Sequence, residues 1–305
     1  MRIGIIGAGA IGCVVGGLLT KAGHDVTLVD QWPEHIETMK SRGLKLSGTC
    51  GDHLIPVRAL HIHELQGVAT PFEAIFVSVV GKSRCLGCVI TIGAGMYEPG
   101  HAMRTDSGSV GFKIGEHDGK DTPRAQALAK VMNDVAGTKV TTNLWGERWS
   151  KLAVNCMANP LAGLSGLGSA EVRTAPVPRR IAIHVAAEVI QVGRAAGYEV
   201  EPIYGIEARR FVDAAQGKGW DAVEADMAAS VKFLTGGRPS MLQDVMKGRR
   251  TEIDYLNGYV SQQGRRLGVP TPVNDAVVAT VRSHGVGTLK PDPKNLEPLL
   301  AALPR

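Results

Sequence analysis

The sequence predicts an α/β domain followed by an all-helical domain. A glycine-rich turn joins the first apolar strand to a helix, and strands alternate with helices as far as residue 142. From residue 143 to residue 305, long segments with helical apolar spacing dominate. A chain of 305 residues suits two domains of roughly 100 to 200 residues each. We therefore expect domains at residues 1–142 and 143–305.

Composition narrows the classes of function. The 34 basic and 29 acidic residues give a net charge of +5 without a basic block, which suits a small anionic ligand better than nucleic acid. Aromatic residues, at 5%, leave little for base stacking. Glycines interrupt the apolar N-terminal run, and no other run reaches the roughly 20 apolar residues of a membrane span. Five cysteines without a clear export signal favour reduced thiols and a cytoplasmic protein.

The first motif lies between two short strands. Residues 2–6 and 24–30 are predicted as strands, and residues 13–22 as a helix. The intervening GAGAIG fits the pattern GxGxxG, and the second strand ends in an acid, Asp30. This order is the dinucleotide-binding fingerprint of a Rossmann domain. The residues predicted to hold the dinucleotide are Gly7, Ala8, Gly9, Ala10, Ile11 and Gly12.

Each glycine of the motif has a separate task. Gly7 permits the tight turn, Gly9 lets the backbone approach the pyrophosphate, and Gly12 lets helix and strand pack closely. The N-terminus of the helix offers free N–H groups to the phosphate charge.

Asp30 bears on the choice of cofactor. Its carboxylate can accept hydrogen bonds from the ribose 2′-hydroxyl of NAD and would repel the 2′-phosphate of NADP, which favours NAD. One alternative is a solvated aspartate at the end of a strand. Another is that Lys40, Arg42 or Lys45 swings toward a phosphate.

Two patterns suggest metal ligands but are incomplete. Cys85 and Cys88 form a CxxC whose side chains would point to opposite faces of a strand, and no second CxxC follows. His61 and His63 could share one strand face, but two ligands without a third make a poor site. We therefore predict no metal and interpret the histidines as a solvated patch.

The change from strands to helices falls near residue 142. Residues 123–135 are predicted as a helix and residues 139–142 as a last short strand. In the helical half, Pro176 and Pro178, and the run 236–239, are interpreted as loops between helices.

Polar residues of the helical half concentrate on one predicted helix. Because residues four apart on a helix lie nearly in line, Lys151, Asn155 and Asn159 form a polar stripe on an otherwise apolar helix. A buried ammonium beside two amides needs polar partners, which are either neighbouring helices or a ligand. Glu252, further along, could pair with Lys151, although such charges also suit a solvated helix face.

Four segments of the chain carry a resemblance: the glycine motif, WSKLAVNCMANPLAG from Trp149, SMLQDVMKGRRTEIDYLNG from Ser240, and LGVPTPVND from Leu267. Together they resemble the ketopantoate reductase (2-dehydropantoate 2-reductase) family. The resemblance runs in order over nearly the whole chain. It implies a Rossmann domain and an all-helical domain with the active site in the cleft between them. It also implies NADPH-dependent reduction of 2-dehydropantoate to pantoate, on the pathway to pantothenate.

The resemblance also implies roles for single residues. Lys151 matches the catalytic lysine that donates the proton, and Glu252 matches the glutamate that orients cofactor and lysine. Ala94 lies in the small-residue stretch that lets the nicotinamide approach. The residues matched to substrate binding are Asn155, Asn159 and Ser240. An ammonium can protonate the developing alkoxide, and neutral amides can fix the hydroxy acid without adding charge.

The chain departs from the family in two respects. Members favour NADPH and usually place a basic residue after the second strand, where this chain has Asp30-Gln31, so the cofactor is predicted as NADP or NAD. The family also has a further helix and strand, ending in a Gln-Asn-Gly turn, that this chain lacks near residues 80–85. The family's lysine at the end of the fourth strand is absent, because Val80 stands in its place and Lys82 is a displaced candidate.

The short connection limits how the flanking strands can pair. From Val80 to Cys85 the chain reaches at most about 17 Å, whereas a parallel crossover needs about a dozen residues. We expect an antiparallel hairpin or a second strand that joins elsewhere, and weak or absent activity on 2-dehydropantoate.

The sequence therefore predicts an NAD(P)-dependent oxidoreductase that acts on a small anionic 2-oxo acid. The alternatives are reduction of a different 2-oxo acid and a dinucleotide-binding protein without turnover. We expect no nucleic acid or membrane as partner, and a homodimer is a candidate assembly.

Overall fold

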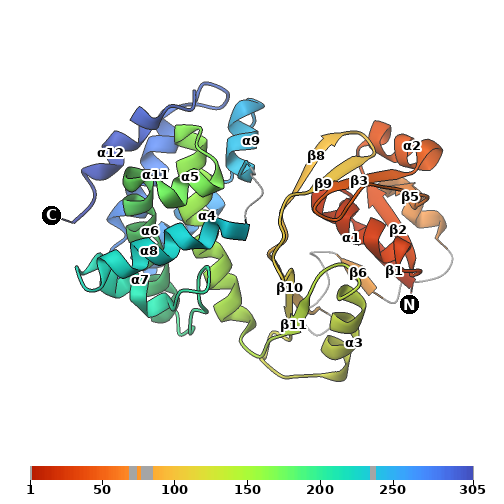
Figure 1. The fold of residues 1–305 in the computed structure, drawn as a ribbon, viewed down its shortest axis with the longest axis horizontal. Coiled ribbons are helices and arrows are strands. Elements are labelled where there is room, and N and C mark those ends of the chain that lie inside the picture. The colour runs from red at the N-terminus through yellow and green to blue at the C-terminus, as the bar shows by residue number, and fades with distance from the viewer. Residues whose placement is uncertain (1, 69–73, 77–84, 234–237, 305) are drawn as a thin grey trace. The chain divides into compact units, whose positions relative to one another are not determined.

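The structure is a computed structural model that describes residues 2–68, 74–76, 85–233 and 238–304 (Figure 1). The chain divides into two compact units, Met1–Leu144 and Trp145–Arg305. The first unit combines sheets with helices and the second is helical, which confirms the predicted fold class.

The N-terminal unit contains β1 (Arg2–Ile6), α1 (Ala10–Lys21), β2 (Asp25–Asp30), α2 (Pro33–Arg42), β3 (Leu44–Gly48), β4 (His53–Ile55), β5 (Arg58–His61), η1 (Ile62–Gly67), β6 (Ala74–Phe76), β7 (Gly87–Ile90), β8 (Ala94–Glu98), β9 (His101–Arg104), β10 (Phe112–Gly115), α3 (Pro123–Met132) and β11 (Thr138–Val140). The C-terminal unit contains α4 (Leu144–Ser165), α5 (Ser169–Thr174), α6 (Pro176–Ala195), α7 (Ala208–Ala215), α8 (Trp220–Ala229), η3 (Ser230–Phe233), α9 (Ser240–Met246), η4 (Ile253–Tyr255), α10 (Asn257–Leu267), α11 (Pro272–Ser283), η5 (Pro293–Leu296) and α12 (Glu297–Leu300).

A parallel sheet carries the glycine motif. Its strand order is β5-β2-β1-β6, and each neighbouring pair runs parallel. The middle of β1 and most of β2 are buried, as expected of central strands covered by helices. α1 packs against both strands, and α2 packs against β2 and β5. The carboxyl ends of β1 and β2 therefore lie side by side, and this edge is where α/β sheets bind dinucleotides.

Two further sheets complete this unit. The order β4-β3-β9-β8 forms one sheet and β11-β10-β7 the other. β6 pairs with β1, whereas β7 pairs antiparallel with β10, so the two strands that flank the shortened connection belong to different sheets. This is the second of the two arrangements expected from the connection length. Val80 and Lys82 lie outside the described residues.

The C-terminal unit is built around α6. Its sequence is apolar on almost every side, and most of its residues are buried beneath α5, α7, α10 and α11. The interpretation of Pro176 and Pro178 as a loop is wrong, because α6 begins at Pro176. Proline is tolerated in the first turn of a helix, where its missing N–H would have no intrahelical acceptor.

Within the residues that the structure describes, no helix is both long and apolar enough to cross a membrane.

Candidate active site

The glycine motif forms a tight turn between β1 and α1. Gly7 has a φ of +99°, and the N–H groups of Gly7 and Ala8 donate to the carbonyl oxygen of Val29 at 2.8 and 3.2 Å. A Cβ at Gly12 would lie 2.1 Å from the carbonyl oxygen of Gly7, so any larger residue would push the helix off the strand. A Cβ at Gly9 would meet no atom within 4 Å, which leaves space for a ligand to approach the backbone.

The first turn of α1 adds hydrogen-bond donors to this space. Cys13 N donates to the carbonyl oxygen of Gly9 at 2.8 Å, and helices leave the N–H groups before this point without intrahelical acceptors. The N–H groups of Ala10, Ile11 and Gly12 thus stand at the positive end of the helix, where phosphates bind. The turn and the helix end fit a dinucleotide pyrophosphate.

Asp30 is held at the carboxyl end of β2. Its Oδ1 accepts a hydrogen bond from the backbone N–H of Trp32 at 2.9 Å. Lys40, one of the cations considered as a phosphate partner, has its Nζ 3.1 Å from Glu64 and 3.2 Å from Glu37. Two carboxylates therefore hold Lys40, which weakens its case as a partner for a 2′-phosphate.

Other residues singled out in this unit lie in defined places. Ala94 begins β8 and pairs with Arg104 of β9. His61 and His63 stack with ring centroids 5.4 Å apart, and His61 Nε2 lies 2.7 Å from Glu37 in a surface cluster of ion pairs. Among the described residues, no three His, Cys, Asp or Glu side chains are arranged to hold a metal ion.

In the C-terminal unit, the predicted polar stripe lies on α4. Lys151 and Asn155 are partly exposed, and Asn159 is 9% exposed. Asn159 Nδ2 donates to Ser240 Oγ at 3.1 Å, across 81 positions of sequence. Ser240 is exposed at the first position of α9. Two of the residues matched to substrate binding are therefore in direct contact.

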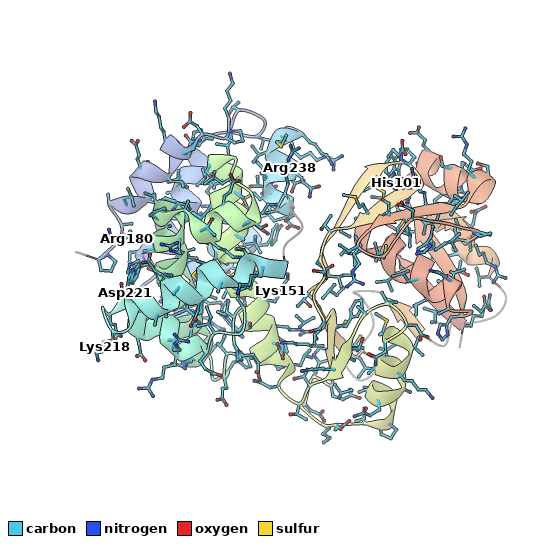
Figure 2. All side chains as sticks on the ribbon, in the orientation of Figure 1. His101, Lys151, Arg180, Lys218, Asp221 and Arg238 are labelled. Atoms are coloured by element: carbon cyan, nitrogen blue, oxygen red, sulfur yellow. The ribbon has the colours of Figure 1, made fainter. Side chains whose placement is uncertain are left out.

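The surroundings of Lys151, which is labelled in Figure 2, disfavour the positive charge of its ammonium. Burial lowers the pKa of Lys151, and the positive charge of Arg173 lowers it further. In the described part of the chain, the ammonium has no hydrogen bond or ion pair. Glu252 is exposed, and the described residues show no ion pair between it and Lys151.

Arg173 is a buried cation that the sequence reasoning missed. It is 8% exposed, and its guanidinium carbon lies 3.6 Å from the ring centroid of Tyr204. Its Nη1 donates to Ser230 Oγ at 3.3 Å. The ring and the hydroxyl fix the charge that acts on Lys151. The surrounding sequence, AEVRT, gives no sign that its arginine is buried.

A buried polar network contacts α4, the helix that carries Lys151 and Asn159, at the carbonyl oxygen of Cys156. Pro160 lies inside α4 and has no N–H, so the carbonyl oxygen of Cys156 loses its usual helical donor. Asn257 Nδ2 takes that place at 3.2 Å and also donates to Asn274 Oδ1 at 2.9 Å. Both asparagines are fully buried. The sequence contains a signal for this contact, because a proline inside a helical pattern leaves one carbonyl oxygen without its intrahelical donor.

Glu188 of α6 ends this network and caps α11. Its Oε1 accepts from Val273 N at 2.9 Å, and its Oε2 accepts from Asn274 N at 2.9 Å and from Asn274 Nδ2 at 2.7 Å. Burial raises the pKa of Glu188, while these hydrogen bonds oppose the shift. A buried carboxylate thus supplies the acceptors that the first turn of α11 lacks.

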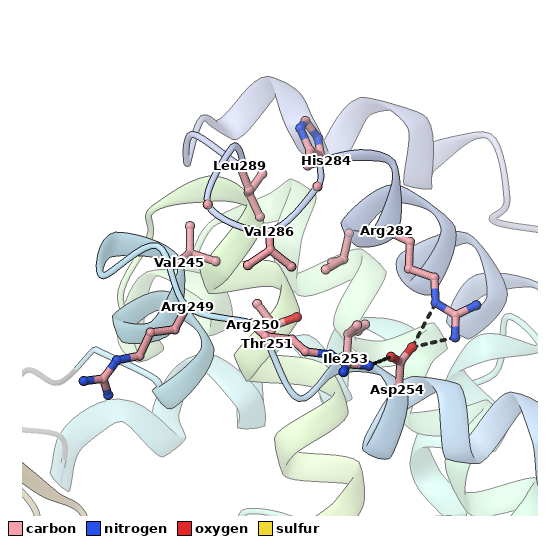
Figure 3. Close-up of a pocket in the computed structure, with 13 residues that line it drawn as sticks. Val245, Arg249, Arg250, Thr251, Ile253, Asp254, Arg282, His284, Val286 and Leu289 are labelled. Carbon is pink, nitrogen blue, oxygen red and sulfur yellow. Dashed lines mark hydrogen bonds and ion pairs between the residues drawn. The ribbon is translucent and has the colours of Figure 1, made fainter.

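A small cavity near Glu252 does not include the predicted substrate residues. It has a volume of about 160 Å³ and lies between the segments that follow α9 and α11 (Figure 3). Val245, Val286 and Leu289 provide apolar walls. Asp254 holds two of its arginines, with Arg282 Nε at 2.9 Å and Arg250 Nη2 at 3.4 Å. Asp254 and two of the arginines that line the cavity are therefore engaged with one another.

A parallel sheet that enters a GxGxxG turn, together with an all-helical second unit, defines a two-domain protein of the Rossmann type. Models of one family match both parts: "Ketopantoate reductase PanE/ApbA" over residues 3–80 and "Ketopantoate reductase PanE/ApbA C terminal" over residues 143–285. The chain belongs to the ketopantoate reductase family. The N-terminal match ends at residue 80, where we expect the missing unit to begin.

Relatives of the chain extend over nearly its full length. A 2-dehydropantoate 2-reductase of Archaeoglobus fulgidus is 28% identical and covers 92% of this chain and 97% of its own length. One of Mesorhizobium japonicum is 28% identical, with 94% and 98% covered. The alignment with the Archaeoglobus fulgidus protein runs over 309 positions but includes only 92% of this 305-residue chain. Some residues of that relative therefore align with gaps and have no counterpart in this chain.

Solved structures share the fold. A 2-dehydropantoate 2-reductase from Geobacter metallireducens matches with a TM-score of 0.75 at 22% identity, over 93% of this chain and 100% of that chain. A D-mandelate dehydrogenase solved with NADH and anilino(oxo)acetate matches with a TM-score of 0.72 at 21% identity, over 93% and 98%.

Proposed function

We propose that this chain is an NAD(P)H-dependent oxidoreductase that reduces a 2-oxo acid to a 2-hydroxy acid. The proposed substrate is 2-dehydropantoate, which the curated names of its relatives specify. The observation that carries the proposal is the arrangement on α4, where Lys151 shares a helix face with Asn159, and Asn159 is hydrogen-bonded to Ser240. A poised cation beside neutral hydrogen-bonding groups suits a small anionic substrate that gains charge on one oxygen.

The residues of the proposed site have different roles in the reaction, which follow from their chemistry. When bound, NADH or NADPH supplies the hydride. Lys151 stabilises the negative charge that develops on the C2 oxygen and donates the proton, which its lowered pKa makes easier. Asn155, Asn159 and Ser240 orient the acid through neutral hydrogen bonds. We assign Glu252 to the orientation of Lys151 and cofactor in the loaded enzyme.

The proposed cofactor is bound by the glycine turn, Asp30 and Ala94. The open space at Gly9 and the donors of α1 suit the pyrophosphate. Asp30 and the ion pairs of Lys40 favour NAD, whereas the family favours NADP.

The function is tested by binding and turnover together. Purified protein is titrated with NADH and NADPH by fluorescence and then offered 2-dehydropantoate and a panel of other 2-oxo acids, aryl ones included. We expect binding, and turnover of 2-dehydropantoate well below an ordinary kcat of about 10 s⁻¹, because the unit after Val80 is missing. Faster turnover of another 2-oxo acid would reassign the substrate. Binding without oxidation of cofactor by any of them would favour a protein without turnover.

Replacement of Asp30 by asparagine is expected to shift cofactor preference toward NADPH. The change removes a negative charge from the position of the 2′-phosphate and keeps an oxygen that can accept the N–H of Trp32. The measurement is the ratio of kcat/KM for NADPH to that for NADH. An unchanged ratio would mean that Asp30 does not reach the ribose. Asp25, at the opposite end of β2, provides the control variant Asp25→Asn.

A further inference from the structure

One exposed aromatic side chain lies beside the proposed cofactor site without an evident structural reason. Trp32 follows β2 and is 40% exposed. One face of its indole is covered by the imidazole of His35, with ring centroids 5.2 Å apart and planes 19° apart. A large flat side chain with one face covered and the rest accessible is a stacking surface for a planar ligand.

The ring beneath Trp32 is fixed in place. His35 is 1% exposed, and its Nδ1 accepts a hydrogen bond from the N–H of Gly100 at 2.7 Å. That bond assigns the imidazole proton to Nε2, which donates to the carbonyl oxygen of Ala8 at 2.9 Å. The imidazole is therefore a rigid support that connects the indole to the glycine motif.

These contacts connect three recognition groups. The carboxylate of Asp30 is bonded to the backbone N–H of Trp32, the indole of Trp32 stacks on His35, and the imidazole of His35 is bonded to the turn at Ala8. The indole, the carboxylate and the turn suit a flat base, a ribose hydroxyl and a phosphate respectively. A base, a ribose and a phosphate are the three groups in the adenosine half of a dinucleotide.

We infer that Trp32 is a cofactor-binding residue whose indole stacks on the adenine of the cofactor, with His35 as its support. The inference rests on the proposed function. Because NADH and NADPH carry the same base, Trp32 sets affinity for both alike, whereas Asp30 sets the ratio between them. The stacked base lies at the far end of the cofactor from the nicotinamide, so Trp32 does not take part in the chemical step.

The test compares Trp32→Ala and Trp32→Phe with the unchanged protein. Dissociation constants are measured for NADH, for 5′-AMP and for reduced nicotinamide mononucleotide, which lacks adenine. We expect Trp32→Ala to weaken NADH and 5′-AMP about 10-fold, and Trp32→Phe about twofold, because a smaller ring still stacks. We also expect an unchanged affinity for the mononucleotide. Binding of 5′-AMP should quench a part of the tryptophan fluorescence that is absent from Trp32→Phe.

Controls separate this inference from the proposed function. Tyr255→Ala removes another aromatic side chain, 76% exposed in the C-terminal unit, and should leave every constant unchanged. Circular dichroism and the thermal midpoint verify that the Trp32 variants are folded. Wild-type affinity of Trp32→Ala for 5′-AMP would overturn the inference and leave the proposed function standing. Failure of the unchanged protein to bind either dinucleotide would overturn both.

Discussion

Replacement of Lys151 by alanine is expected to lower kcat for 2-oxo acid reduction about 100-fold or more while NADH binding persists. The proposed proton donor and charge stabiliser is lost, whereas the glycine turn that holds the pyrophosphate is unchanged. The measurements are steady-state kcat and a fluorescence titration with NADH. Lys218, exposed on the same unit, provides the control Lys218→Ala, which should retain full activity (Figure 2).

The pH dependence of kcat for the same reaction is a second test of the role of Lys151 as proton donor. Burial and the charge of Arg173 lower the pKa of this lysine, so it loses its proton at a lower pH than an exposed lysine does. As a general acid it works only while protonated, so kcat should fall as the pH rises through this lowered pKa. Near wild-type kcat in Lys151→Ala, or the same alkaline fall in that variant, would remove Lys151 from the mechanism.

Replacement of Glu188 by alanine is expected to lower the free energy of unfolding of the C-terminal unit by about 3 kcal/mol. The change leaves two buried donors, the N–H groups of Val273 and Asn274, without an acceptor, and it removes one of the two acceptors of the Asn274 side chain, which keeps the carbonyl oxygen of Val185 at 3.3 Å. Denaturant unfolding followed by tryptophan fluorescence measures it. A Trp32→Phe background confines the signal to Trp145, Trp149 and Trp220, which all belong to this unit.

A control variant and a pH series test whether Glu188 caps α11. Glu224 forms a partly exposed ion pair with Arg179 on the same unit, and Glu224→Ala should cost less than about 1 kcal/mol.

Because burial raises the pKa of Glu188, its contribution to folding is greatest below the unfolded-state pKa and is lost as the pH rises through the folded-state pKa. The advantage of wild type over Glu188→Gln should therefore shrink as the pH rises above the ordinary pKa of a glutamate and through the raised folded-state pKa. Equal losses in Glu188→Ala and Glu224→Ala would contradict a capping role.

Local patterns predicted the glycine turn and the position of the polar stripe. Both depend on residues that are close in sequence. The glycines of GxGxxG allow a strand to turn directly into a helix. Lys151 and Asn159 share a helix face because a helix repeats every 3.6 residues. Their assignment to substrate and cofactor stays a prediction.

Contacts between distant segments could not be predicted in the same way. Arg173 is buried because Tyr204 and Ser230 meet it from other elements, and nothing within its own segment indicates this. The cap on α11 comes from a glutamate 85 positions earlier. The sheet that β7 joins is likewise set by tertiary packing, since its length and composition would suit either neighbour.

The departure of β7 to another sheet has a consequence for the behaviour of the protein at high concentration. In the part of the chain that the structure describes, the sequence of strands β5-β2-β1-β6 ends at β6, which has a strand partner on one side. A strand edge offers backbone N–H and C=O groups in register for another extended chain, and natural sheets usually protect such edges. The outer edge of β6 is therefore where we expect self-association by strand addition to begin.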